Sequence, residues 1–288
     1  MVEEAEFFVI EETAHPLSRY LRAAMMPHIW CTGCGNGIIL NCFVHALDEL
    51  QVDLNKIVVV SGIGCIGRAA GYLNTNSFHT THGRPIAFAT GVKLANPKLE
   101  VVVISGDGDL FAIGGNHFIH AARRNIGVKV ICANNFNYGM TGGQQGPTTP
   151  LEALTTTSPY GNIEHPFNLV HLAAASGAIY VARWTTLHVR RLTQSIKKLL
   201  QKEGFGFIEV ISPCPEIYGR HNKMRTGLEM MEWFKKASVV DDFSDPAKAE
   251  VTREKIVVGE FVDTEKPSYE KLLYEKIAQI REKGRLVN

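Results

Sequence analysis

Four of the six cysteines in this 288-residue chain are spaced in a way that suits metal or redox chemistry. Cys31 and Cys34 stand in the glycine-rich stretch "IWCTGCGNG", Cys65 lies in "SGIGCIGR", and Cys214 lies in "SPCP". A C-x-x-C pair serves a redox dithiol, half of a zinc site or part of an iron–sulfur cluster. Spacing does not separate these roles, although four converging thiolates suit either zinc or a 4Fe-4S cluster.

Oxygen-bearing side chains form a second group in "GDGDLFAIGG" and "ICANNFNYG". Asp107 follows one apolar run, and Asn135 follows the next run 28 residues later. If the two runs are parallel strands, a right-handed crossover brings their ends to one edge of the sheet. A carboxylate, an amide oxygen and a backbone carbonyl then form an oxygen site for Mg²⁺, which can hold a diphosphate.

Other interpretations of the glycine turn explain less. A nucleotide P-loop requires Gly-Lys-Ser/Thr, which does not follow, and a dinucleotide fingerprint requires a third glycine where Phe111 stands. A simple turn accounts for each stretch taken alone. Only the metal–diphosphate interpretation uses both stretches together.

The elements that must position these groups are short apolar runs that alternate with amphipathic stretches. The runs predict buried strands at 56–60, 99–105, 128–134, 178–184 and 206–212. The stretches between them predict helices at 36–50, 85–95, 113–124, 166–176 and 187–202. This order predicts an α/β fold with a doubly wound, mostly parallel sheet and helices on both faces.

The positions of the predicted strands and helices distinguish two kinds of cysteine. Cys65 and Cys214 follow strand ends, at the edge where open α/β sheets bind their ligands. Cys42 and Cys132 fall inside a helix and a strand, where we expect buried, small hydrophobic side chains. A thioredoxin-like dithiol is disfavoured because the C-x-x-C pair precedes the first strand.

The chain divides into three predicted parts. They are an N-terminal extension at 1–27, a cofactor-binding domain at 28–222 and a C-terminal helical extension at 223–288. The last helix has one apolar stripe and a stop at Gly284, and we expect it to dock on a partner subunit. The stripe consists of Leu273, Ile277 and Ile280.

Composition excludes several classes of partner. A net charge of +1, from 30 basic and 29 acidic residues, gives no electrostatic reason to expect nucleic acid or an anionic membrane surface. No apolar run approaches the ~20 residues of a membrane-spanning helix. The acidic start "MVEEAEFFVIEE" lacks the features of a secretory signal. We therefore expect a cytoplasmic, reducing environment.

Several motifs together resemble one protein family. The stretches "WCTGCGNG", "VVSGIGCIGR", "THGRPIAFATGVKLANP", "GDGDLFAIGGNHF", "NYGMTGGQ" and "SPCP" occur in the order found in β subunits of 2-oxoacid:ferredoxin oxidoreductases, which are thiamine diphosphate enzymes. The 2-oxoglutarate enzymes (2-oxoglutarate synthases) are the most similar. The resemblance covers residues 28–218 and implies the corresponding thiamine diphosphate-binding fold.

The resemblance also implies the ligand sets. Four thiolates would ligate one 4Fe-4S cluster, namely Cys31, Cys34, Cys65 and Cys214. Mg²⁺ would be held by Asp107, Asn135 and the main chain of Asn137. The residues expected to contact thiamine diphosphate are Ile63, Gly64, Cys65, His82, Gly106, Asp107, Gly108, Asp109, Asn135, Asn137, Gly139, Met140 and Thr141.

Three further residues are candidates for catalysis. His82 and Arg84 belong to "FHTTHGR", which precedes a predicted helix and contains the "HGR" of family members. We expect His82 near the cofactor or substrate and Arg84 as an anchor for an anionic group. Thr141 lies in a glycine-rich loop that could close over substrate. His117 and His120 are expected to pack or to form hydrogen bonds.

The activity implied by the resemblance is oxidative decarboxylation of 2-oxoglutarate to succinyl-CoA and CO₂, or the reverse reaction. Electrons would pass one at a time through the cluster to ferredoxin. The catalytic glutamate would belong to the pyrimidine-binding domain of an α subunit, so we expect an αβ or (αβ)₂ assembly and an inactive isolated chain. The alternatives are a pyruvate or branched-chain 2-oxoacid enzyme, a zinc-stabilised binding subunit without redox chemistry, and a non-oxidative thiamine decarboxylase.

Overall fold

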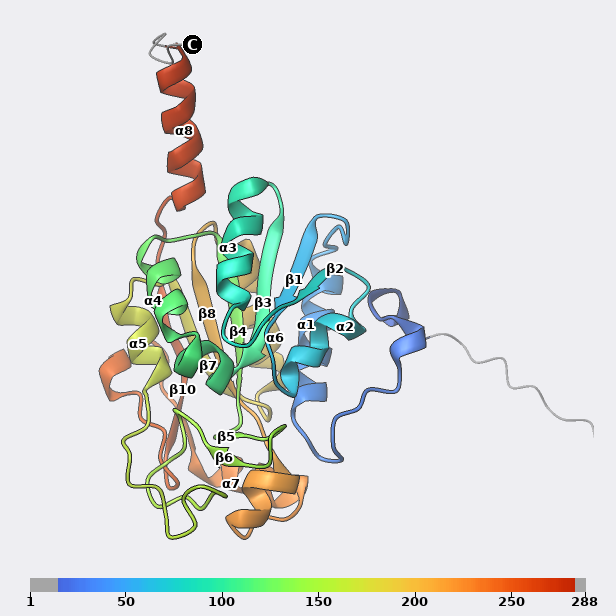
Figure 1. Ribbon diagram of the computed structural model, residues 1–288, viewed down its shortest axis with the longest axis vertical. Coiled ribbons are helices and arrows are strands. Elements are labelled where there is room, and N and C mark those ends of the chain that lie inside the picture. Colours follow the sequence, from blue (N-terminus) through green and yellow to red (C-terminus); the bar gives the residue numbers. More distant parts are fainter. Residues whose placement is uncertain (1–14, 283–288) are drawn as a thin grey trace, which may run out of the picture.

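The computed structural model describes residues 15–282, and its centre is an eight-stranded sheet (Figure 1). The strand order is β2-β1-β3-β4-β8-β7-β10-β9, and neighbours are parallel except for the antiparallel pair β10 and β7. The strands are β1 (Ile57–Ser61), β2 (Asn76–His79), β3 (Glu100–Gly106), β4 (Val128–Asn134), β7 (Tyr180–Thr185), β8 (Gly206–Ile211), β9 (Ser238–Val240) and β10 (Ile256–Asp263). A separate small hairpin pairs β5 (Asn137–Tyr138) with β6 (Gln144–Gln145).

Helices cover both faces of the sheet (Figure 1). The helices α1 (Asn36–Glu49) and α6 (Val189–Gln201) pack on one face, and α3 (Pro85–Ala95), α4 (Gly115–Arg123) and α5 (Leu169–Ala175) pack on the other. The remaining α-helices are α2 (Ala69–Tyr72), α7 (Gly227–Ala237) and α8 (Tyr269–Glu282). Segments of 3₁₀ or π-helix lie at Ser18–Tyr20, Ala23–Met25, Ile66–Arg68, Gly108–Ile113, Pro215–Gly219 and Pro246–Lys248.

The central strands are apolar on both sides because successive side chains point to opposite faces. Along β3, Val101 and Val103 belong to the core beneath α3 to α5, whereas Val102 and Ile104 belong to the core beneath α1 and α6. The predicted doubly wound, mostly parallel sheet is confirmed. All five predicted strands and all five predicted helices are present, with ends that shift by a few residues.

The C-terminal part differs from its predicted helical character. Strand β10 lies in the segment 223–288 and pairs with β7 in the main sheet, so the prediction of a purely helical extension is wrong there. The charged residues around β10 obscured its apolar core, of which Ile256, Val257 and Val258 are buried. The exposed edge strand β2 was also missed, because its polar sequence carries no buried pattern.

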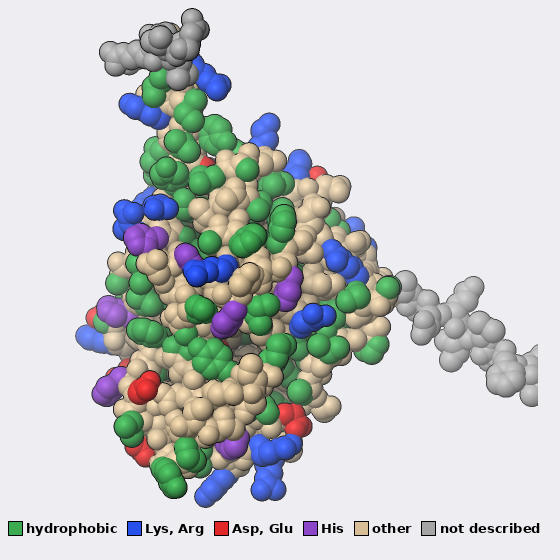
Figure 2. All heavy atoms as spheres, viewed as in Figure 1, with side chains coloured by type: hydrophobic (Ala, Val, Ile, Leu, Met, Phe, Trp, Pro, Cys, Tyr) green, Lys and Arg blue, Asp and Glu red, His purple; other side chains and the backbone are tan. Residues whose placement is uncertain are grey.

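Helix α8 projects from the body of the molecule (Figure 1). Its first two turns contact the body: a carboxylate oxygen of Glu270 accepts from Gly127 N at 3.1 Å, and Tyr274 Oη donates to Leu94 O at 3.0 Å. Hydrophobic side chains lie along the helix (Figure 2), and the exposed or partly exposed ones include Leu272 and the residues of the predicted stripe. Docking of this helix on a partner stays a prediction, and Gly284 lies outside the described residues.

Part of the predicted extensions lies outside the described residues. The first 14 residues of the predicted N-terminal extension also lie outside the described range. Within residues 15–282, every helix is too short or too polar to cross a membrane.

Candidate functional site

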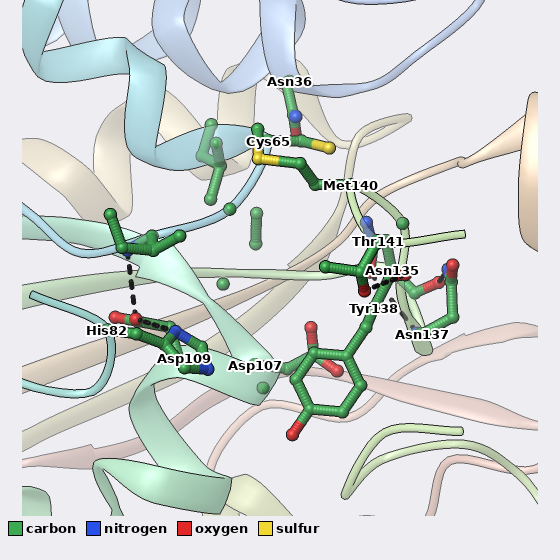
Figure 3. A pocket seen from close by; sticks show the side chains of 17 residues that line it. Asn36, Cys65, His82, Asp107, Asp109, Asn135, Asn137, Tyr138, Met140 and Thr141 are labelled. Carbon is green, nitrogen blue, oxygen red and sulfur yellow. Dashed lines mark hydrogen bonds and ion pairs between the residues drawn. The ribbon is translucent and has the colours of Figure 1, made fainter. Parts of the chain in front are cut away.

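The site lies at the C-terminal ends of four adjacent parallel strands, β1, β3, β4 and β8. Cys65, Asp107, Asn135 and Cys214 each follow one of these ends. A cavity of about 240 Å³ opens there (Figure 3). All thirteen residues expected to contact thiamine diphosphate line it, together with Asn36, Ile66, Ala133 and Tyr138. The structure brings the predicted residues together, while their binding roles remain predictions.

Asp107 provides a buried carboxylate in this cavity. Its side chain follows β3, and one carboxylate oxygen accepts from Thr148 Oγ1 at 2.5 Å. Burial raises the pKa of this carboxyl to about 6, against the opposing effect of the Thr148 hydroxyl and nearby backbone N–H groups. A bound divalent cation would stabilise the charged form. Metal ligation requires that deprotonated form.

The turn after β4 presents amide groups to the same cavity. Phe136 has a φ of +65° and a fully buried ring, so the chain reverses sharply between Asn135 and Asn137. Asn137 Nδ2 donates to Asn135 O at 2.7 Å. Asn137 Oδ1 is buried and has no hydrogen-bond partner within the described part of the chain. An unpartnered buried oxygen beside a carboxylate fits the oxygen donor set that Mg²⁺ prefers.

Asp109 has a different function from Asp107 although it lies only two residues away. Its carboxylate accepts from Ile63 N at 3.1 Å, from Gly83 N at 2.7 Å and from Ser105 Oγ at 2.8 Å, and His82 Nδ1 lies 2.7 Å away. These contacts tie the loops after β1 and β2 to β3. Asp109 is therefore a buried anchor that shapes the cavity wall.

The close packing around Asp109 explains one glycine. A Cβ at Gly62 would lie 2.0 Å from a carboxylate oxygen of Asp109. The loop after β1 can approach the carboxylate only because residue 62 has no side chain. That approach also fixes Ile63 and Gly64 on the cavity wall.

The two candidates in "FHTTHGR", His82 and Arg84, lie in different surroundings. His82 lines the cavity and is oriented by Asp109, which leaves Nε2 of the ring as the second hydrogen-bonding atom. Arg84 is exposed, does not line the cavity, and makes a short contact from Nη1 to His117 Nε2. The predicted role of Arg84 as an anion anchor is not supported by its position in this chain.

Thr141 lies at the tip of the β5–β6 hairpin. Its hydroxyl donates to Gln144 Oε1 at 2.6 Å, and Gln144 Nε2 donates back to Thr141 O at 2.8 Å. Thr141 and the half-exposed Met140 both line the cavity. The hairpin thus forms one wall of the site, which fits the expected loop beside the substrate.

The four candidate cysteines gather beside the cavity. Gly35 N donates to Pro213 O at 3.1 Å, and a Cβ at Gly35 would lie 2.5 Å from Pro213 Cδ, so the loop of Cys34 packs directly against that of Cys214. Trp30 Nε1 donates to Cys65 O at 2.6 Å and ties this loop to the end of β1.

The thiols affect one another electrostatically. Burial raises the pKa of Cys34 to about 12, and the thiols of Cys214, Cys65 and Cys31 add to the rise. Burial also raises the pKa of Cys65 to about 11, with contributions from Cys214 and Cys31. A cationic metal group would reverse this effect and favour thiolates, as in Fe–S sites. The donor set therefore fits a four-thiolate cofactor.

The remaining cysteines behave as expected, since Cys42 and Cys132 are fully buried in the two cores. All six cysteines have free thiols. Within residues 15–282, no three His, Cys, Asp or Glu side chains form a group that could hold a single metal ion.

Sequence reasoning missed several residues of the site. Asn36 lines the cavity directly after the cysteine loop, and its buried Nδ2 has no partner within the described chain. Its place in "WCTGCGNG" was the only available signal. Tyr138 lies against Gly108, where a Cβ would come within 2.2 Å of the ring. Thr148 contacts Asp107 from a distant loop, and no motif marked it.

Known proteins of similar sequence have this architecture. Residues 62–210 match the family model described as "Thiamine pyrophosphate enzyme, C-terminal TPP binding domain". The 2-oxoglutarate synthase subunit KorB of Methanocaldococcus jannaschii is 53% identical over 267 residues, which cover 93% of this chain and 99% of that protein. The 2-oxoacid:ferredoxin oxidoreductase subunit beta of Saccharolobus solfataricus is 44% identical over 196 residues, which cover 67% of this chain and 64% of that protein.

A solved structure agrees with these relatives. The 2-oxoglutarate:ferredoxin oxidoreductase from Magnetococcus marinus, with 2-oxoglutarate, coenzyme A and succinyl-CoA bound, superposes with a TM-score of 0.83 and 32% sequence identity. The match covers 94% of this chain and 93% of that chain. The motifs, the fold and the relatives lead to one assignment: the chain belongs to the β subunits of the 2-oxoacid:ferredoxin oxidoreductases, which are thiamine diphosphate enzymes.

Proposed function

We propose that this chain is the β subunit of a coenzyme A-dependent 2-oxoglutarate:ferredoxin oxidoreductase. One observation carries the proposal: the Asp107 carboxylate, the turn from Asn135 to Asn137 and the Cys65 thiol line one cavity at the ends of adjacent strands. The overall reaction converts 2-oxoglutarate and coenzyme A to succinyl-CoA and CO₂ and releases a pair of electrons, or runs in reverse. Relatives that carry this name over nearly their full length support the choice of substrate.

Asp107, Asn135 and the main chain of Asn137 would hold Mg²⁺, which in turn would hold the diphosphate. Bound thiamine diphosphate supplies the nucleophilic carbon that adds to the ketone of a 2-oxoacid and accepts electrons as CO₂ leaves. The glycines at 106, 108 and 139 expose backbone to this part of the cavity. Main-chain N–H groups there would contact the phosphates.

His82 and Thr141 are the candidates for contact with substrate. Asp109 accepts a hydrogen bond from His82 Nδ1 and thereby fixes the ring, so that Nε2 would accept or donate a proton in the cavity. The Thr141 hydroxyl lies on the opposite hairpin, where it would contact the substrate or the cofactor. Met140 beside it would help to exclude water.

Cys31, Cys34, Cys65 and Cys214 would ligate a 4Fe-4S cluster. Cys65 lines the cofactor cavity, whereas Cys31 is exposed, so the four thiols span the distance from the cavity to the surface. Electrons would leave through this group one at a time and reduce ferredoxin. Burial of Cys34 and Cys65 would contribute to the reduction potential.

The active assembly requires an α subunit. The described chain supplies one sheet and one half of the cofactor site, and the pyrimidine-binding domain with its catalytic glutamate would come from α. An αβ or (αβ)₂ assembly follows from this division. The free thiols suit the cytoplasmic location predicted from the sequence.

The test is anaerobic co-purification with an α subunit, followed by a panel of 2-oxoacids with coenzyme A and ferredoxin or viologen as acceptor. We expect 2-oxoglutarate to reduce the acceptor with the highest kcat/KM and to yield succinyl-CoA. Asp107→Ala in the β chain should abolish the reaction, and Arg84→Ala, which changes an exposed side chain outside the cavity, serves as its matched control.

Three outcomes would change the proposed function. Preference for pyruvate or a branched-chain acid would keep the family and change the substrate. Release of an aldehyde without acceptor reduction would identify a non-oxidative decarboxylase. A colourless protein with stoichiometric zinc and no turnover would refute the redox function.

A further inference from the structure

A buried row of polar contacts connects the Asp107 carboxylate to an ion pair two strands away, and the single hydroxyl proton of Thr148 lies between two acceptor oxygens in it. Thr148 Oγ1 lies 2.5 Å from Asp107 Oδ2 and 2.9 Å from Asn134 Oδ1. Asn134 Nδ2 donates to Glu209 Oε1 at 2.7 Å, and Arg183 Nε donates to Glu209 Oε2 at 2.6 Å. All five side chains are at least 97% buried.

The register of the sheet places these groups on one face. Arg183 on β7 pairs with Glu209 on β8, and Glu209 pairs with Cys132 on β4. Asn134 shares a face with Cys132 because side chains alternate along a strand. The three polar side chains therefore form a row across adjacent strands, on a face of the sheet whose core is mostly apolar.

Each nitrogen of the Arg183 guanidinium has at least one hydrogen-bond partner. Nη1 donates to Ala249 O at 2.7 Å and Val257 O at 3.2 Å, and Nη2 donates to Asn168 Oδ1 at 3.1 Å. Burial of an ion pair costs several kcal/mol per ion unless hydrogen bonds compensate, so such a pair is weak evidence for stability alone. A positioning role gives the pair a function that an apolar pair could not supply.

Asn134 is the junction of this network. Its Oδ1 accepts from Phe136 N at 3.0 Å and also faces Thr148 Oγ1. Phe136 is the left-handed residue at the centre of the turn that carries Asn135 and Asn137. One side chain thus contacts both halves of the candidate Mg²⁺ site: the Asp107 side through Thr148 and the asparagine turn through Phe136.

We propose that Arg183, Glu209, Asn134 and Thr148 form a positioning relay that sets the geometry of the metal site. Glu209, held by Arg183, fixes the amide of Asn134 so that its oxygen faces Thr148 and Phe136 N. This inference rests on the proposed function, because it requires that Asp107 and the Asn135 turn bind Mg²⁺. Mg²⁺ demands near-ideal octahedral geometry, so small displacements of its ligands lower affinity.

The expected size of the effect follows from other metal sites. Loss of a group that orients a metal ligand commonly weakens metal binding by about 10–100-fold. Thr148→Val keeps the side-chain shape and removes the bridging hydroxyl. Thr148→Ser keeps the hydroxyl and should restore binding. We expect about a tenfold or greater increase in metal Kd for valine and near wild-type binding for serine.

The Arg183–Glu209 ion pair, at the end of the relay away from Asp107, is tested by the double variant Arg183→Met/Glu209→Met. Replacing a buried ion pair with apolar side chains of similar volume is often tolerated, so the fold should persist. The matched control is Lys129→Met, at the opposite end of β4, where a buried ammonium donates to Gly204 O at 3.1 Å. It should change stability without changing metal binding.

The measurement uses the αβ complex after removal of divalent metal and thiamine diphosphate. Mn²⁺ is titrated in the presence of saturating thiamine diphosphate, and free Mn²⁺ is followed by its room-temperature EPR signal. Unfolding temperatures are recorded for every variant. A global loss of stability would weaken Lys129→Met and Thr148→Val alike, whereas the relay predicts weakening in Thr148→Val and in the double variant only.

The results separate the relay from the proposed function. If the wild-type complex binds no Mn²⁺ with thiamine diphosphate, the metal site itself is wrong. If the wild type binds and Thr148→Val binds equally well, the relay is refuted. If the double variant binds Mn²⁺ with wild-type affinity, Arg183 and Glu209 are not part of the relay. If Lys129→Met weakens Mn²⁺ binding as much as the relay variants do, the loss of affinity is not specific to the relay.

Discussion

Replacing Asp107 with asparagine should stabilise the metal-free chain and abolish its response to Mg²⁺. Burial of the carboxyl raises its pKa from the usual 3.8 to about 6. An asparagine at this position could still accept the hydrogen bond from Thr148 Oγ1, which now reaches a carboxylate oxygen. The substitution therefore removes a buried charge and keeps its hydrogen bond.

The magnitude follows from the pKa. The difference between 3.8 and about 6 corresponds to about 3 kcal/mol at neutral pH. Because the folded-state pKa is the higher one, the folded state binds more protons between these values, and ionisation lowers stability as pH rises from about 4 to about 6. The advantage of Asp107→Asn should be absent near pH 4 and complete by about pH 7.

The assay is urea unfolding of the chain freed of metal and cofactors, followed by tryptophan fluorescence at several pH values. Mg²⁺ and thiamine diphosphate at about 100 times their Kd should then stabilise the wild type by about 2.7 kcal/mol. They should have little effect on Asp107→Asn. The unfolding slope should remain unchanged, which would show that stability and not compactness has altered.

Asp109→Asn is the matched control, because the same substitution two residues away should have the opposite effect. The Asp109 carboxylate faces three donors from Ile63 N, Gly83 N and Ser105 Oγ, as well as the His82 ring. An amide would turn an NH₂ group toward one of these donors and cost about 2–4 kcal/mol. The reasoning is refuted if Asp107→Asn destabilises the metal-free chain at neutral pH or if Asp109→Asn is neutral.

Three further outcomes are expected. Mn²⁺ binding to the cofactor-loaded site should weaken by about fivefold from pH 6 to pH 5 in calorimetric titrations, because protonation of Asp107 competes with the metal; a flat profile would exclude this carboxylate as a ligand. Cys31→Ser should lower the iron content of anaerobically purified protein, whereas Cys132→Ser, which alters a thiol inside β4, should not. An equal loss of iron in the two variants would contradict the cluster assignment. Gly62→Ala should lower unfolding stability by about 2–4 kcal/mol, because its Cβ would lie 2.0 Å from the Asp109 carboxylate, and unchanged urea unfolding would disprove that close contact.

Much of the fold was predictable because the central strands are buried on both faces. Continuous apolar runs such as 128–134 carry that signal within a few residues of sequence. The exposed strand β2 and the strand β10 escaped prediction, since β2 has a polar sequence and the apolar core of β10 stands among charged residues. Local patterns carry no information about which edge of a sheet remains free to accept another strand.

The candidate site was predictable where its residues belong to motifs at strand ends. Asp107, Asn135, Cys65 and Cys214 follow predicted strands, so the parallel topology alone brings them to one edge. Arg84 shows the limit of motif reasoning, because the residue follows His82 closely in sequence and yet faces His117 at the surface. The direction of a side chain depends on local backbone geometry that a motif does not specify.

The sequence by itself determined the α/β class, the strand ends that carry chemistry and the family to which the chain belongs. Tertiary structure decided which of two neighbouring aspartates belongs to the candidate metal site and which is held by donors from the surrounding loops. It also assembled Thr148, Asn134, Glu209 and Arg183 from four separate segments into one network. The physical reason is that burial and hydrogen-bond partners set the role of a polar side chain, and both arise only when distant segments pack together.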